Sequence, residues 1–168
     1  MKKLFMILVL AAVAGWSGYL IYQALTPKSA KLHEQYQTFI ATIDETRYKT
    51  TAAYRFEVDE ELRARRFAMA SSYNADKKPD EAIVLLEGLI AVMNKQQYVL
   101  DKKVRRNSGQ AELVAIYYES LAASYGMKHD EEKRVWALQK SDEYKAEAAM
   151  LEKRGLKKRA QRIPTPGC

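Results

Sequence analysis

Hydrophobic positions along most of the chain recur at the spacing of α-helices. Leu32, Tyr36, Phe39 and Ile43 follow one another at intervals of four, three and four residues, which places them on one face of a helix. No Pro or Gly interrupts residues 28–78, so nothing in that stretch forces a helix to break. The pattern predicts an all-α fold.

Four further helices are predicted between residues 63 and 154. They cover residues 63–73, 79–93, 112–125 and 130–154. Pro79 suits the first turn of a helix, because that position needs no amide donor. Gly126 suits a helix end and Asp130 a helix start.

Residues 48–58 alternate between apolar and polar side chains, which is typical of a strand. No partner strand is evident, and an isolated strand leaves its backbone groups unpaired. We therefore expect a helix here, or a joint between two helices near Thr50 and Thr51. Asp59 and the two glutamates after it indicate a fresh helix start.

The N-terminal segment has the pattern of a membrane span. The run from Leu4 to Leu25 contains no charged residue and, at about 1.5 Å per residue, is long enough to cross a bilayer as a transmembrane helix. The alternative is a signal peptide cleaved after Ala14. Lys2 and Lys3 precede the span and form a short tail, which favours a cytoplasmic N-terminus. The prediction is a single-pass protein of the bacterial inner membrane, with its helical domain in the periplasm.

The amino-acid composition excludes several classes of protein. The 168 residues carry a net charge of +7, with 48% hydrophobic residues, 7 Gly and 4 Pro, which disfavours both a disordered chain and a β-sandwich. One Cys excludes an internal disulfide, and His33 and His129 lack neighbouring metal ligands. No catalytic, metal-binding or cofactor-binding residue is assigned. The chain is therefore predicted not to be an enzyme, although a site built from scattered residues stays possible.

The pair of helices between residues 63 and 93 resembles a tetratricopeptide repeat (TPR). The residues at its pattern positions are Arg66, Met69, Ala70 and Tyr73 on the first helix and Ala82 and Leu86 on the second. The small side chains of Ala70 and Ala82 are expected to let two antiparallel helices approach closely. The resemblance implies a small antiparallel helical (TPR-like) domain that binds other proteins.

A second copy of the pattern follows 52 residues later, against about 34 for tandem repeats. Its first half consists of Tyr118, Leu121, Ala122 and Tyr125. Arg134 stands where the second small residue is expected. A plain helical bundle is the alternative to a repeat.

These features divide the chain into four predicted parts. They are a membrane anchor over residues 1–27, a connecting amphipathic helix over 28–58, the TPR-like domain over 59–154 and a basic, Pro-containing tail over 155–168.

Tyrosine is the residue type most suggestive of an interaction surface, since it is enriched at protein interfaces. The candidates are Tyr73, Tyr117, Tyr118 and Tyr125. Adjacent residues on a helix point about 100° apart, so Tyr117 and Tyr118 cannot enter the same core contact. One of them is expected to face a partner; packing within a partly exposed core is the alternative.

Positive charge is concentrated near the C-terminus. The basic residues there are Lys153, Arg154, Lys157, Lys158, Arg159 and Arg162. They suit anionic lipid headgroups or an acidic patch on a protein, with a solvated tail as the alternative. Nucleic acid is not expected as a partner.

Together these observations predict a membrane-anchored scaffold or accessory subunit that assembles or stabilises a membrane protein complex through contacts with other membrane or periplasmic proteins. The alternative function is a transient peptide-binding TPR adaptor in assembly or secretion.

Overall fold

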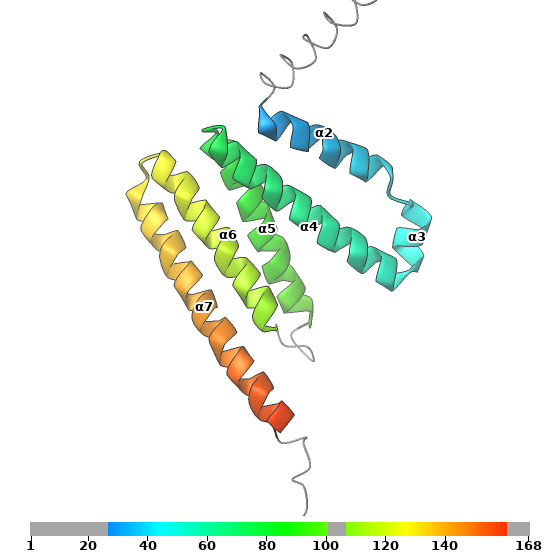
Figure 1. The fold of residues 1–168 in the computed structure, drawn as a ribbon, viewed down its shortest axis with the longest axis vertical. Coiled ribbons are helices and arrows are strands. Elements are labelled where there is room, and N and C mark those ends of the chain that lie inside the picture. The colour runs from blue at the N-terminus through cyan, green and yellow to red at the C-terminus, as the bar shows by residue number, and fades with distance from the viewer. Residues whose placement is uncertain (1–26, 101–106, 161–168) are drawn as a thin grey trace, which may run out of the picture.

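The computed structural model describes the backbone of residues 27–100 and 107–160, and within it the side chains of residues 27–94 and 107–155. Over these residues the fold is all-α, as the hydrophobic spacing predicts (Figure 1). The helices are α2 (Lys28–Ala41), α3 (Glu45–Thr50), α4 (Ala52–Ala75), α5 (Pro79–Leu100), α6 (Ser108–Met127) and α7 (Glu131–Ala160).

The predicted membrane span requires a correction. Among the residues that the structure describes, no helix is long and apolar enough to cross a membrane. Even α6, whose side chains are mostly apolar, includes Glu112 and Glu119, and charged groups are costly in hydrocarbon. The fold class with a transmembrane helix, the inner-membrane location and the periplasmic placement are therefore not supported. The segment on which they rested, residues 4–25, lies outside the described residues.

The region between residues 28 and 75 forms three helices. Asp44 begins α3 by accepting a hydrogen bond from the backbone N–H of Arg47 at 2.9 Å. Thr51 is extended and separates α3 from α4, so the predicted joint near Thr50 and Thr51 is confirmed. The predicted helix start at Asp59 is wrong: Asp59 lies inside α4, where it accepts the hydroxyl of Tyr48 at 2.7 Å. The predicted domain boundary after residue 58 also falls inside α4.

Two helical hairpins form the centre of the structure, α4 with α5 and α6 with α7 (Figure 1). Helix α5 packs against both α4 and α6, which joins the hairpins, and α2 lies along α4. Half of the main core cluster comes from α6. The cluster consists of Ala70, Leu86, Leu89, Ile90, Met93, Val114, Tyr117, Tyr118, Leu121, Ala122, Tyr125 and Ala137.

The two hairpins turn in the same way. In the first, the N–H of Lys78 donates to the carbonyl of Tyr73 at 2.8 Å; in the second, the N–H of Asp130 donates to the carbonyl of Tyr125 at 3.0 Å. Lys77 and His129 take the left-handed conformation that such helix ends require, with φ of 57° and 58°. Tyr125, His129 and Asp130 of the second turn each lie 52 positions after Tyr73, Lys77 and Lys78 of the first. Gly126 lies inside α6, so its predicted role as a helix end is wrong.

The small residue expected at Arg134 occurs one turn later. Ala137 is fully buried, as Ala82 is in the first hairpin. Arg134 instead pairs with Glu131 through two contacts of 2.6 and 2.7 Å. A Cβ on Gly126 would lie 3.2 Å from the side chain of Arg134, so the glycine leaves room for that arginine. The close helix contact is thus present in both hairpins.

Bulky residues at the two buried alanines should destabilise the fold. We expect Ala82→Trp and Ala137→Trp each to lower the free energy of unfolding by about 1–3 kcal/mol or more, because the added volume overpacks the contact between the helices. Lys78→Trp, at an exposed position, should stay within about 0.5 kcal/mol of the parent. Thermal and urea unfolding measure the difference. Equal stability of the three variants would contradict the hairpin packing.

Candidate protein-interaction surface

Tyr117 and Tyr118 both lie in the core. Their side chains leave α6 in different directions and meet different helices. The ring of Tyr117 is 5.2 Å from that of Phe67 on α4. The ring of Tyr118 is 5.6 Å from both Trp136 and Tyr144 on α7. The pair thus joins the two hairpins, and neither ring is on the surface of the chain.

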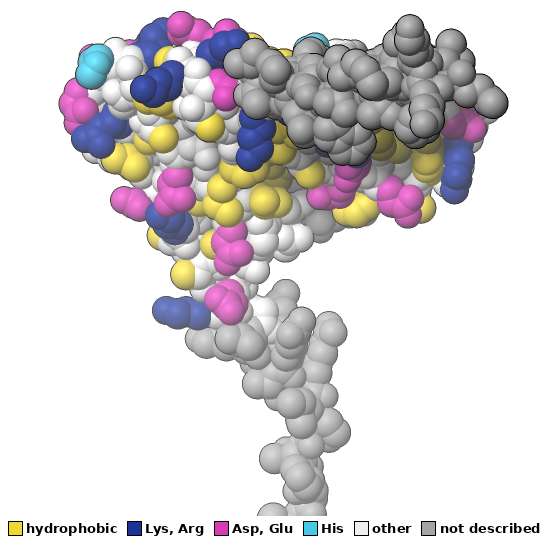
Figure 2. Space-filling model, turned by 45° about the horizontal axis from the view of Figure 1, so that its top comes forward, with side chains coloured by type: hydrophobic (Ala, Val, Ile, Leu, Met, Phe, Trp, Pro, Cys, Tyr) yellow, Lys and Arg dark blue, Asp and Glu magenta, His cyan; other side chains and the backbone are white. Residues whose placement is uncertain are grey.

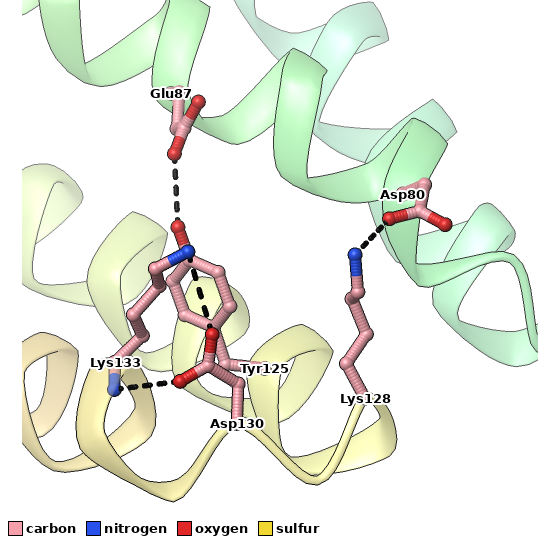
Figure 3. A network of polar contacts seen from close by, with 6 residues as sticks. All are labelled: Asp80, Glu87, Tyr125, Lys128, Asp130 and Lys133. Atoms are coloured by element: carbon pink, nitrogen blue, oxygen red, sulfur yellow. Dashed lines mark hydrogen bonds and ion pairs between the residues drawn. The ribbon is translucent and has the colours of Figure 1, made fainter.

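Tyr125 is also buried and connects α6 to α5. Figure 3 shows its hydroxyl directed at Glu87, to which it donates a hydrogen bond of 2.9 Å. Burial first, and then the bond to the Glu87 carboxylate, raises the pKa of Tyr125 to about 12. The ring is covered by Lys133, whose ammonium lies 5.5 Å from the centroid.

Polar contacts hold the turn between α6 and α7 in place. Asp130 begins α7 by accepting the backbone N–H of Lys133 at 3.2 Å, which confirms the predicted helix start. The Nζ of Lys133 also pairs with Asp130 (Figure 3). Lys128 reaches across to Asp80 at the start of α5. This network closes one end of the hairpins, and its groups are already paired with one another.

Tyr73 is the one predicted tyrosine that is partly exposed. It lines an open apolar hollow of about 270 Å³ where α2, α4 and α5 meet. The other lining residues are His33, Met69, Glu81, Val84 and Leu85. The structure therefore separates Tyr73 from the three tyrosines of α6.

The basic residues near the C-terminus are described only in part. Lys153 and Arg154 are exposed on α7. Lys157, Lys158 and Arg159 belong to the same helix by backbone, and their side chains, like all of Arg162, lie outside the described residues. Binding of anionic lipid or of an acidic protein patch by this segment stays a prediction.

Exposed apolar side chains occur over much of the domain, and Figure 2 shows them scattered among charged ones. Scattered apolar groups are normal on a protein surface. A site needs an ordered arrangement, and α6 supplies one. Its exposed side carries Leu113, Ile116, Ser120, Ala123 and Met127, which we call the α6 stripe.

The α6 stripe follows the heptad spacing of helices that pack on one another, with intervals of three, four, three and four residues. Leu113, Ile116 and Met127 are its large members, and each is more than a third exposed. The sequence contains this spacing, but the sequence alone does not distinguish it from the core positions of α6. Apolar residues lie all around the helix, so only the packing identifies the uncovered side.

Helix α4 lies beside the α6 stripe. Asn74 joins the two helices, because it accepts the hydroxyl of Ser124 at 2.8 Å and donates to the carbonyl of Ser120 at 3.4 Å. The exposed side of α4 carries only small residues over its last three turns: Ala64, Ala68, Ser71 and Ala75. Since α5 packs against both helices, these exposed sides lie together on the face away from α5. We call this surface the α4–α6 face.

Groups suited to metal binding or catalysis do not gather on this surface. Within the described ranges, no group of three or more His, Cys, Asp or Glu side chains is placed to hold a metal ion. His33 is exposed on α2, and His129 is exposed in the turn between α6 and α7. The surface offers shape and apolar area, which are the requirements of a binding site.

No protein-family model matches the chain, and neither a curated protein nor a solved structure matches it. The described fold defines the class only as an all-α protein of two helical hairpins. The TPR resemblance stays a prediction, and a fold of this class does not by itself specify a function.

Tyr125 gives the domain a measurable dependence on alkaline pH. Because its pKa is raised from 10 to about 12 in the folded chain, its stabilising contribution is present below pH 10 and is lost as the pH rises to about 12. We expect Tyr125→Phe to lose about 1 kcal/mol at pH 8, where the hydrogen bond to Glu87 is broken, and to show a shallower fall above pH 10. Urea unfolding between pH 8 and 12 measures both. If the free energy of unfolding fell equally with pH in the parent and in Tyr125→Phe, the raised pKa would not belong to Tyr125.

Proposed function

We propose that the chain is a non-enzymatic scaffold that binds another protein through the α4–α6 face. The observation that carries the proposal is the α6 stripe. Helix α6 is the most enclosed helix in the described structure, yet it presents large apolar side chains to water in a regular row. Burying such side chains on a partner yields about 25 cal/mol per Å² before the costs of association.

The TPR resemblance adds support to this proposal. Two hairpins with identical turns, 52 residues apart, and a buried alanine in each second helix are the features expected of a repeated helical unit. A short array of such units presents a continuous face to a partner.

The alternative function is a transient peptide-binding adaptor, and the hollow beside Tyr73 favours it. A hollow of about 270 Å³ lined by Met69, Val84 and Leu85 accommodates one large apolar side chain. A single anchor of this kind suits weak, reversible capture, whereas the long α6 stripe suits a lasting contact. Both surfaces involve α4, but Met69 and Tyr73 line the hollow and neither belongs to the α4–α6 face, so variants separate the two functions.

Site-specific crosslinking tests the scaffold proposal. A photo-crosslinking amino acid in place of Ile116 should give one discrete protein adduct in producing cells. The matched control replaces Val135 on α7, because both side chains are 42% exposed and apolar. The adduct should disappear when Leu113→Asp is added to the Ile116 variant, since a charge on the stripe opposes burial.

The expected result is an adduct at position 116, lost with Leu113→Asp, and none at position 135. Identical adduct patterns at the two positions, or none at 116, would refute binding through the α4–α6 face. An adduct formed only by the same amino acid at Val84 would favour the adaptor instead.

A further inference from the structure

We propose that the partner segment on the α4–α6 face is an amphipathic helix whose apolar stripe is flanked by Lys and Arg. This inference rests on the proposed function and specifies the chemistry of the partner. It follows from three properties of the face: the spacing of its apolar side chains, the small residues beside them, and the sign of the charges at its edges.

The spacing indicates a helix as the occupant. Apolar side chains repeating every 3.5 residues form the seam along which two helices pack, with each side chain inserted between residues of the other helix. An extended peptide has a repeat of two residues and does not match the intervals from Leu113 to Met127.

The small residues indicate that this helix approaches closely. The small residues on the exposed sides of the two helices are Ala64, Ala68, Ser71 and Ala75 on α4 and Ser120 and Ala123 on α6, and we take them as the floor of the binding surface. Small residues at a helix contact permit the short interaxial distances, about 8 Å, at the low end of the usual range. The large side chains of Leu113, Ile116 and Met127 border this floor and contact the sides of the bound helix.

The charges at the edges specify a basic partner. Glu112 and Glu119 lie seven residues apart on the side of the α6 stripe that faces α7, at the position where heptad helices carry their pairing charges. Glu57 and Glu60 are exposed nearer the start of α4, beyond the small residues of the α4–α6 face, and Glu60 pairs with Arg63. Lys145 pairs with Glu119 at 2.5 Å and is half exposed.

The acidic character of this face runs against the charge of the chain. The whole sequence has a net charge of +7, so non-specific attraction favours acidic partners. Glu112 and Glu119 at its edge, with Glu57 and Glu60 further along α4, outnumber the two cations that pair with them, so the local charge favours the opposite sign. A preference for a basic helix is therefore evidence for this face and not for general electrostatics.

Two designed peptides test the inference on the full chain. Both are four-heptad helices with Leu and Ala on the apolar stripe; one has Lys at all flanking positions and the other has Glu. Fluorescence anisotropy at 50 mM salt should show that the Lys peptide binds about tenfold more tightly, because several weak exposed ion pairs add together. The preference should shrink at 500 mM salt, where exposed charges are screened.

Variants then locate the binding site. Glu112→Lys should weaken binding of the Lys peptide about threefold to tenfold. Glu132→Lys is the matched control, because it makes the same charge change at an exposed position near the start of α7, and it should leave binding unchanged. Ile116→Asp should abolish binding of the Lys peptide, while Val135→Asp should not.

The outcomes separate this inference from the proposed function. Equal binding of the two peptides, tighter binding of the Glu peptide, equal effects of Glu112→Lys and Glu132→Lys, or no binding of either peptide would each overturn the basic helix as the occupant. The scaffold proposal depends instead on the crosslink at position 116 and fails only if that crosslink is missing or non-specific.

Discussion

Side chains on about half of the circumference of α6 are buried. Three helices, α4, α5 and α7, pack against α6 and cover them. Helix α7 covers the side of Tyr118 and Ala122, α5 covers the side of Tyr125, and α4 contacts Tyr117 through Phe67. This enclosure determines how the two hairpins are joined. It also explains why a run with two adjacent tyrosines is compatible with a fully packed interior.

The same enclosure leaves one side of α6 open, and the sequence on that side is not what a solvated helix face requires. Leu113, Ile116 and Met127 stay apolar although each is more than a third exposed. The neighbouring face of α4 stays small, with alanine and serine at its outer positions. Apolar side chains, small neighbouring residues and an acidic edge occur together here, and the proposed binding of a helix would account for all three.

Helical spacing predicted the all-α fold, the joint at Thr51 and the start of α7 at Asp130, because local patterns and caps determine these features. The burial of the tyrosines could not be predicted in the same way. Whether Tyr117 or Tyr118 is covered depends on which helices surround α6, and apolar residues lie all around that helix. Arg134 occupied the expected alanine position because the second hairpin makes its contact one turn later, at Ala137. The predicted membrane span had an apolar segment as its only basis, and no described helix supports it.

Native-state hydrogen exchange tests most directly the claim that α6 is the structural centre of the domain. If three helices enclose α6, its amides exchange only when the whole domain unfolds, so their exchange free energies equal the global free energy of unfolding. Amides of α2, which contributes only Ser29 to the buried residues, should exchange through smaller local openings. Exchange of α6 at the rate of α2, with α4 and α5 still protected, would contradict the account.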